Sequence, residues 1–311
     1  MTKDSIKVFA PATVANVACG FDVLGFAVEK PGDEIVIRKT NKKGVKITAI
    51  TGDEGKLSYN PAENTAGIPA LMFLEKIGGD IGVEISLHKK MPLGSGLGSS
   101  AASAAASAFA INELFGCPLS KKELLSFAMK GEEVACGSAH ADNVAPSLLG
   151  GFILIRSYHP LDVVKINTPT ELYCTLIHPQ IEVRTKDARE ILKKKIPLPD
   201  AIVQWGNVGG LVAGLLMSDY ELIGRSLKDV IIEPVRAILI PTFYEVKNAA
   251  AEAGALGTSI SGSGPSIFSL CKGKEVAEKV GEAKQRAFQK AGIECEVYVS
   301  KVNEAGPVIL G

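Results

Sequence analysis

This chain of 311 residues has no net charge, no long apolar stretch and no paired cysteine motif. Lysine and arginine together number 34, as do aspartate and glutamate, so no overall field attracts nucleic acid or an anionic membrane. No apolar run approaches the length of a membrane span, and the N-terminus leads into a predicted strand without signal-peptide features. The composition therefore favours a cytoplasmic globular protein with neither nucleic-acid nor membrane partners.

The cysteine pattern gives no sign of a disulfide framework or a zinc site. The six cysteines form no CxxC pair, and no Cys/His cluster has zinc spacing; they are Cys19, Cys117, Cys136, Cys174, Cys271 and Cys295. We expect them to be reduced and mostly buried. The chain is longer than one ordinary core requires. We therefore expect two domains, 1–157 and 158–311, because turn residues cluster at 157–160.

A glycine-rich stretch is the most informative part of the chain. It lies between a segment with strand-like alternation, 83–87, and an alanine-rich segment, 101–115, that predicts a helix. The stretch reads Pro92-Leu93-Gly94-Ser95-Gly96-Leu97-Gly98-Ser99-Ser100. Glycines let a backbone approach a ligand closely, and free N–H groups at a helix start attract anions. The spacing matches neither a Walker A motif nor GxGxxG, so spacing alone leaves phosphate binding and an ordinary turn both open.

Other polar residues in the first half have both structural and functional interpretations. Asn64 fits the N-cap of a helix predicted to run to about residue 77. Glu132 and Glu133 lie late in a predicted helix, where the helix dipole disfavours acids, although a solvated helix face would also explain them. Three polar residues follow within four positions: His140, Asp142 and Asn143. No Ser or Cys nucleophile motif lies nearby, so a hydrolase triad has little support.

The second half alternates strands and helices, which favours a two-layer α+β domain. Strands are predicted at 172–178, 266–270 and 294–299, and helices at 187–194, 203–217, 241–253 and 274–291. A second Gly/Ser loop, 257–265, includes Gly262 and by itself predicts a tight turn before a strand. Arg189 and Arg236, taken singly, would be ordinary surface residues.

The glycine-rich stretch resembles the phosphate loop of the GHMP kinases, a family of small-molecule kinases. Similar motifs run along the whole chain: Pro-Ala-Thr at 11–13 with Gly-Phe-Asp at 20–22, His-Ala-Asp-Asn-Val-Ala-Pro at 140–146, and the second Gly/Ser loop. The resemblance implies an α+β fold of two domains, a ribosomal protein S5 domain 2-like N-terminal domain and a ferredoxin-like C-terminal domain. It also implies ATP and Mg²⁺ as cofactors and suggests a homodimer.

The resemblance further implies a role for each candidate residue. Residues 92–100 would bind the phosphates of ATP, Asn64 would border the base, and Ser100 with Glu132 would hold Mg²⁺. The remaining residues match the branch of the family that acts on L-homoserine. There Asp22 would hold the substrate ammonium and two arginines its carboxylate, in a pocket formed by Asn16, Asp22, His140, Asn143, Arg189, Arg236 and Gly262.

The implied reaction is transfer of the ATP γ-phosphate to the side-chain hydroxyl of L-homoserine, a step of threonine biosynthesis. Asp142 or Asn143 would face that hydroxyl; we favour Asn143, and the residues leave both open. One alternative is a GHMP kinase for a sugar or mevalonate, but neither substrate carries an ammonium beside a carboxylate. A second alternative is a non-catalytic sensor, and the intact phosphate loop with Ser100 and Glu132 argues against it.

Overall fold

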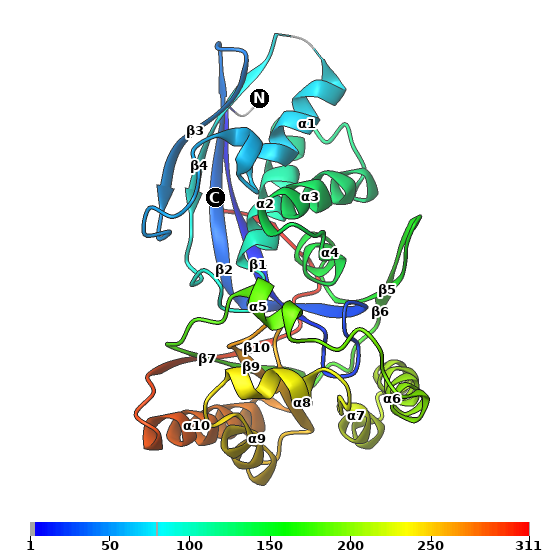
Figure 1. Cartoon of the computed structure of the whole chain (residues 1–311). Helices are drawn as coiled ribbons and strands as arrows, with labels where there is room; N and C mark the ends of the chain where they lie inside the picture. The colour runs from blue at the N-terminus through cyan, green and yellow to red at the C-terminus, as the bar shows by residue number, and fades with distance from the viewer. Residues whose placement is uncertain (1–3, 79, 311) are drawn as a thin grey trace.

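The computed structural model describes residues 4–78 and 80–310. They form two β-sheets, each covered by helices, one above the other in Figure 1. The upper sheet contains β1 (Ser5–Ala15), β2 (Leu24–Thr40), β3 (Gly44–Thr51), β4 (Gly82–His88), β5 (Phe152–Tyr158), β6 (Leu161–Ile166) and β11 (Val308–Leu310). The helices around it are η1 (Pro61–Glu63), α1 (Gly67–Ile77), α2 (Ser99–Leu114), α3 (Lys121–Cys136) and α4 (Ala141–Leu149).

The strand β2 organises the upper sheet. The order is β11-β1-β2-β4-β3, and β2 also pairs with β5, which pairs with β6. One end of β2 pairs Leu24 with Leu154 of β5, and the other pairs Arg38 with Glu84 of β4. The sequence predicts only residues 33–38 of this strand, because Pro31 and Gly32 interrupt the apolar alternation. The structure continues the strand across them, with a register shift in β1 between Pro11 and Thr13.

The lower sheet has the strand order expected of a ferredoxin-like domain. It contains β7 (Leu172–Pro179), β8 (Gly257–Ile260), β9 (Ile267–Lys272) and β10 (Cys295–Lys301) in the order β10-β7-β9-β8, and every pair is antiparallel. The helices of this half are α5 (Thr185–Glu190), α6 (Leu198–Met217), α7 (Tyr220–Ser226), α8 (Glu233–Arg236), η2 (Ala237–Leu239), α9 (Phe243–Glu252) and α10 (Lys274–Lys290). The two-sheet α+β architecture predicted above is therefore the observed one.

The chain changes sheet later than the cluster of turn residues suggests. Residues 157–160 belong to the β5–β6 hairpin: 157 and 158 end β5, 159 and 160 form the turn, and Tyr158 pairs with Leu161. The change from one sheet to the other falls between Ile166 and Leu172, and β11 returns to the upper sheet at the end. The division into folding units at residue 157 stays a prediction. None of the helices in the described residues combines the length and apolarity needed to cross a membrane.

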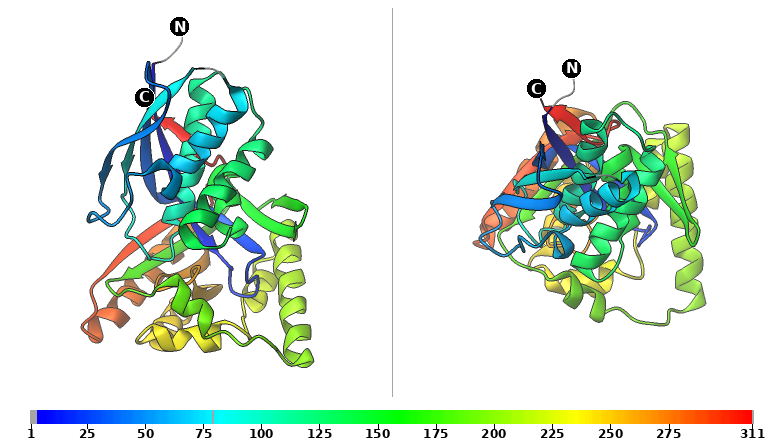
Figure 2. Two further views of the ribbon diagram at one scale, coloured as in Figure 1. Left: turned by 45° about the horizontal axis from the view of Figure 1, so that its top comes forward. Right: turned by 90° about the horizontal axis from the view of Figure 1, so that it is seen from above.

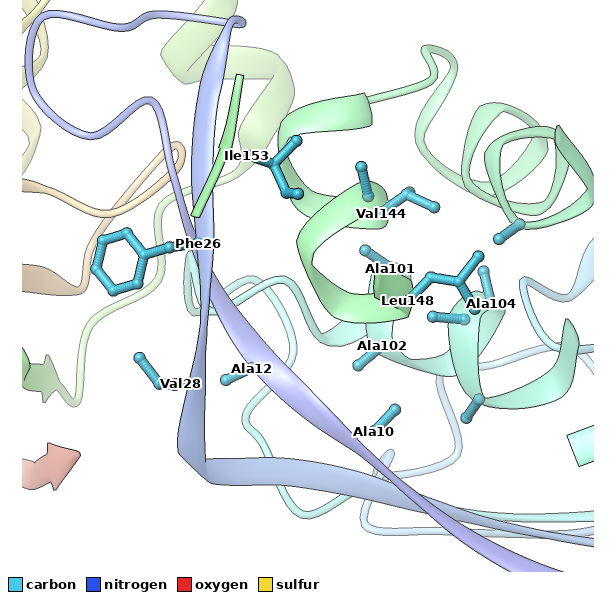
Figure 3. Packing of buried hydrophobic residues seen from close by; sticks show 14 of the residues in the cluster. Ala10, Ala12, Phe26, Val28, Ala101, Ala102, Ala104, Val144, Leu148 and Ile153 are labelled. Carbon is cyan, nitrogen blue, oxygen red and sulfur yellow. The ribbon is translucent and has the colours of Figure 1, made fainter. Parts of the chain in front are cut away.

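The alanine-rich helix α2 lies at the centre of the upper half. Thirteen of its sixteen residues are buried, most of them Ala or Ser. Figure 3 shows Ala102 near Ala10 of β1 and Ala101 near Val144 and Leu148 of α4. Short side chains allow this close packing, and larger ones would cost about 1–3 kcal/mol each. The helix start is thereby fixed against the sheet, and this fixes the loop that precedes it.

Candidate active site

One cavity of about 290 Å³ brings together most of the predicted site residues. Residues from both halves of the chain line it. They include Asn16, Asp22, Gly94, Ser95, Gly96, Gly98, Ser99, Ser100, Glu132, His140, Asp142, Asn143, Arg189, Arg236 and Gly262. Leu93 also lines the cavity, whereas Pro92, Leu97 and Asn64 do not. Segments more than 200 residues apart in the sequence therefore meet at one place.

The phosphate loop requires glycine for two physical reasons. Gly94, Gly96 and Gly98 have φ values of 68°, 76° and 69°, in the left-handed region that disfavours other residues. A β-carbon at Gly96 would lie 2.5 Å from the carbonyl oxygen of Ser261, and one at Gly98 would lie 2.1 Å from Thr13 Oγ1. The phosphate loop therefore packs closely between the second Gly/Ser loop, 257–265, and β1.

The start of α2 lines the cavity and has no side-chain cap. Gly98 is the N-cap residue and supplies no side-chain cap, so the first-turn N–H groups keep their capacity to bind an anion. The Ser95 hydroxyl is buried and has no hydrogen-bond partner among the described residues. These donors meet the requirements of a phosphate site.

A buried ion pair between Lys89 and Asp33 supports the loop, and no local pattern in the sequence predicts it. Lys89 Nζ is paired with Asp33 and also donates to Ser99 O and Ser103 Oγ, both at 2.7 Å. Asp33 in turn accepts from Ser99 Oγ at 2.8 Å and from the backbone N–H groups of 90–91. A fully bonded buried pair holds its neighbours in one geometry. The pair therefore fixes the start of α2 to β2.

Glu132 is a buried carboxylate with one oxygen left over. Its Oε1 accepts from Ser100 Oγ at 3.0 Å and lies 3.7 Å from His140 Nδ1. Its Oε2 is buried and has no hydrogen-bond partner among the described residues. Glu133 turns away and pairs with Lys130 at the surface at 2.7 Å. The free oxygen of Glu132, beside a phosphate site, fits a divalent cation.

The protein would supply few ligands to such a cation. Within the described ranges, no group of three or more His, Cys, Asp or Glu side chains is arranged to hold a metal. Mg²⁺ is commonly held by one or two protein oxygens together with phosphate and water. Glu132 and the Ser100 hydroxyl are compatible with that mode.

Asp142 is a buried acid in an unusual electrostatic setting. Its Oδ2 accepts from the Asn16 N–H at 3.3 Å, and its Oδ1 has no partner among the described residues. Burial raises the pKa of Asp142 to about 7, and the Asp22 carboxylate contributes in the same direction, while His140 opposes it. Burial alone would lower the pKa of His140, but the carboxylates of Glu132 and Asp142 raise it above its ordinary value.

Asn143 is positioned by β1. Its Oδ1 accepts from Thr13 Oγ1 at 2.7 Å, so its amide oxygen is engaged and the residue lines the cavity. Asp142 and Asn143 both line the cavity. Which of them faces a substrate hydroxyl therefore stays a prediction, and we still favour Asn143.

Three further charged residues line the cavity, and two of them, Asp22 and Arg189, contact each other. Arg189 Nη2 donates to both carboxylate oxygens of Asp22, at 2.9 and 3.2 Å. Arg236 is buried and donates to Ala188 O and Gly262 O, both at 3.0 Å. Burial lowers the pKa of Arg236 to about 10, and the nearby Arg189 adds to this effect, but the guanidinium keeps its charge at neutral pH.

An aromatic ring lies beneath both arginines. The guanidinium carbons of Arg189 and Arg236 lie 5.6 and 5.1 Å from the centre of the Phe21 ring, within the range of a cation–π contact. Phe21 lies in the Gly-Phe-Asp motif at 20–22, and its side chain was not predicted to belong to the site. Asn16 and Asp22, on the same β1–β2 connection as Phe21, have backbone φ values of 69° and 58°. Non-glycine residues with such values are strained and cluster at functional sites.

Asn64 is a structural residue in this fold. Its side chain donates to Ser58 O at 2.8 Å and accepts from the Ala66 N–H at 2.9 Å. The N-cap residue of α1 is Ala66, so the predicted helix begins later than expected. Leu57 and Thr65 line the cavity instead. A role for Asn64 near the base of a nucleotide is untested.

Comparisons with known proteins agree with the fold and the site. The family model for the GHMP kinases N terminal domain matches residues 64–151, and that for the GHMP kinases C terminal domain matches residues 211–290. The chain belongs to the GHMP kinase family, whose members use ATP. Within it, the chain is similar to homoserine kinases along nearly its whole length.

Two curated relatives and two solved structures illustrate this. The chain is 55% identical to the homoserine kinase of Chlorobium phaeobacteroides (strain BS1), covering 97% of this chain and 98% of that one. It is 43% identical to the Arabidopsis thaliana homoserine kinase, covering 97% and 84%. A solved homoserine kinase from Cytophaga hutchinsonii ATCC 33406 superposes with a TM-score of 0.98 at 62% identity, covering 100% and 98%. The L. major mevalonate kinase, at 15% identity and a TM-score of 0.73, covering 97% and 99%, shares the fold alone.

Proposed function

We propose that this protein is a homoserine kinase. It transfers the γ-phosphate of ATP to the side-chain hydroxyl of L-homoserine and gives O-phospho-L-homoserine for threonine biosynthesis. The observation that carries the proposal is the cavity that holds a phosphate loop at one end and Asp22, Arg189 and Arg236 at the other. An acid beside two arginines is complementary to an ammonium beside a carboxylate. The 55% identity with a curated homoserine kinase supports the same substrate.

The acceptor amino acid binds by exchanging partners with the protein. Its ammonium takes the place of the Arg189 guanidinium at Asp22, and its carboxylate takes the place of Asp22 at Arg189. Arg236 also binds the substrate carboxylate. The Arg236 guanidinium has a fixed position because it donates hydrogen bonds to two main-chain carbonyl oxygens. The substrate side chain then points toward Asn143 and the phosphate loop.

The protein's part in the transfer is positioning and charge neutralisation. Backbone N–H groups of 94–100, with the Ser95 hydroxyl, hold the phosphates. Ser100 and Glu132 would hold Mg²⁺, which when bound neutralises charge on the phosphoryl oxygens. Phosphoryl transfer passes through a loose transition state, so a weak base or none suffices. Asn143 orients the hydroxyl, while Asp142 keeps a negative charge close to the substrate ammonium above its pKa of about 7.

A substrate panel tests the function. ADP release is measured by a coupled assay with homoserine, mevalonate, galactose, serine and shikimate as acceptors. We expect turnover with homoserine far above that with the other four. Turnover with mevalonate or galactose instead would assign the chain to another branch of the family. ATP binding without turnover of any acceptor would favour a sensor.

We further propose that the enzyme works in the cytoplasm as a homodimer of chains folded as two units, 1–157 and 158–311. Limited proteolysis of the full chain checks the division. Two stable fragments that separate near residue 157 would support it. Cleavage confined to 167–171, where the chain changes sheet, would move the boundary there.

A further inference from the structure

One buried side chain of α6 contacts both of the segments that carry acceptor-binding charges. Gln204 is only 7% exposed, although glutamine is a residue type found mostly at the surface. Its Nε2 donates to Cys19 O at 2.9 Å and to Asp229 Oδ1 at 3.0 Å, and its Oε1 accepts from the Val230 N–H at 3.1 Å. Both amide hydrogens and the amide oxygen are therefore in use. Through them Gln204 joins two segments that are far apart in the sequence.

The first segment is the connection between β1 and β2, residues 16–23, which carries Asp22. Figure 2 shows this connection, in dark blue, reaching from the upper half toward the yellow-green α6. Four of its residues, none of them glycine, have φ values between 40° and 69°: Asn16, Val17, Ala18 and Asp22. Such a backbone is strained and persists only where its surroundings hold it. The position of Asp22 therefore depends on the groups that hold this connection.

Contacts at its start, middle and end hold the connection. At the start, Asn16 Nδ2 donates to Gly262 O at 2.7 Å. At the end, Tyr158 Oη donates to Asp22 O at 2.8 Å. Gln204 holds the middle through Cys19 O. Because the strained backbone relaxes when a contact is lost, removal of the Gln204 amide is expected to move Asp22.

The second segment, residues 229–236, carries Arg236. Asp229 accepts from the backbone N–H groups of residues 231–233, each at 2.9 Å, and so fixes the start of α8. Arg236 is the last residue of this short helix and is buried. Since Gln204 binds Asp229 Oδ1 and the next N–H along the chain, it also fixes where α8 begins.

We propose that Gln204 is a positioning residue for the acceptor amino acid and sets the spacing between Asp22 and Arg236. The inference rests on the proposed function, because it takes the acceptor to be an amino acid whose ammonium binds Asp22 and whose carboxylate binds Arg236. An α-amino acid carries both groups on one carbon, so it reaches both charges only when their separation is right. Gln204 does not line the cavity itself and acts through the two segments that it joins.

Steady-state kinetics of Gln204→Met test the inference. Methionine has a similar length and fills irregular space, but it lacks the amide hydrogen bonds. KM for homoserine should rise about tenfold, because a misplaced pair of charges binds the substrate poorly, while KM for ATP stays nearly unchanged. Discrimination against 4-hydroxybutanoate, which is homoserine without the ammonium, should shrink by a similar factor. A merely structural role would lower the melting temperature without changing that discrimination.

Asn207 provides the matched control, because it lies about one turn further along α6. Its Nδ2 donates to Lys228 O at 3.0 Å, beside the segment that Gln204 binds, and neither Asn207 nor Lys228 lines the cavity. Asn207→Ala removes this bond and should leave both KM values and the discrimination unchanged. If Gln204→Met does not fold, the same constants are measured on Gln204→Glu, which keeps the shape of the side chain and an acceptor for the Val230 N–H.

The outcomes separate this inference from the proposed function. A wild-type protein that does not turn over homoserine would refute the function. If the wild-type protein turns over homoserine and the folded Gln204 variant keeps the same KM for it, the positioning role alone is overturned. An equal rise of KM for ATP would also overturn that role, because the effect would then reach the whole cavity rather than the acceptor charges.

Discussion

In the mode of binding proposed above, the two ends of the cavity bind their ligands by different means. At the phosphate end the binding groups are backbone N–H groups at a helix start, held by glycines and by the buried pair of Lys89 and Asp33. At the acceptor end they are charged side chains, Asp22, Arg189 and Arg236, from segments far apart in the sequence.

This difference teaches where specificity resides. Backbone groups recognise a phosphate whatever is attached to it, so the phosphate end suits any kinase that uses ATP. Side chains set the charge and shape of the acceptor end, and a change there alters the choice of substrate. Substitutions at the two ends should therefore act on different kinetic constants.

The largest effect is expected where the two ends meet. Glu132→Gln keeps the size of the side chain but removes the charge that would oppose Mg²⁺. We expect kcat to fall about a hundredfold or more, with the fold intact. Steady-state ADP release at varied Mg²⁺, together with circular dichroism, checks this.

The neighbouring glutamate provides the control for that variant. Glu133 is half exposed and pairs with Lys130 at the surface, so Glu133→Gln should be near neutral. Unchanged turnover of a folded Glu132→Gln protein at limiting Mg²⁺ would remove Glu132 from the metal site.

A substitution of Arg236 should affect the acceptor end alone. Arg236→Lys keeps the positive charge but loses the planar guanidinium, which can bind a carboxylate through two parallel hydrogen bonds. Loss of a charged hydrogen bond costs about 1.5–3 kcal/mol, so KM for homoserine should rise about ten- to a hundredfold. KM for ATP should stay nearly constant, and discrimination against 3-aminopropan-1-ol should shrink in parallel.

The exposed Arg184 gives the matched control. It pairs with Asp187 at 2.8 Å and does not line the cavity, so Arg184→Lys should leave both KM values unchanged. If Arg236→Lys instead raises KM for ATP and keeps the discrimination against the decarboxylated analogue, then Arg236 does not hold the carboxylate.

The acceptor end should also respond to pH in a way that the phosphate end does not. Asp142 has its pKa raised to about 7 by burial and by Asp22, so it loses its proton as the pH rises from 6 to 8. The new negative charge favours a substrate ammonium, and KM for homoserine should fall up to about tenfold over this range. Asp142→Asn should abolish that part of the pH dependence. An equal pH dependence in the variant would assign the titration to another group.

The smallest effect is expected for Asn143→Asp. A loose transition state needs little help with the proton, so a carboxylate in place of the amide should change kcat by about threefold or less. Single-turnover measurement of phosphoryl transfer gives the rate of the chemical step directly. A large gain in that rate would mean that proton removal limits the reaction, and that Asn143 does more than orient the hydroxyl.

Local signals in the sequence predicted the parts of the fold that obey local rules. The glycine-rich stretch followed by helix α2 is observed as predicted, and the GHMP kinase fold that the resemblance implied is confirmed. Helix α6 begins at Leu198, earlier than the predicted 203, because Pro199 fits the first turn of a helix. Helix α4 was not predicted, since Pro146 lies inside it and polar residues fill its first turn.

The missed site residues depend on tertiary contacts that no local pattern reports. Lys89 is a lysine after a strand, and only its pairing with Asp33 and Ser99 makes it a support of the loop. Phe21 becomes relevant because two arginines from distant segments lie near its ring. The roles of the site residues came from the resemblance to a family, and the structure adds that most of them share one cavity.

The ion pair between Asp22 and Arg189 makes the acceptor site respond to two charges at once. A simple amine that binds Asp22 leaves the Arg189 guanidinium without its partner. A simple acid that binds Arg189 leaves the Asp22 carboxylate without its partner. Either ligand breaks one pair to form one pair and gains little. A zwitterion breaks one pair and forms two. In the proposed mode of binding, the acceptor site therefore selects ligands that carry a positive and a negative group together, and it discriminates against singly charged metabolites.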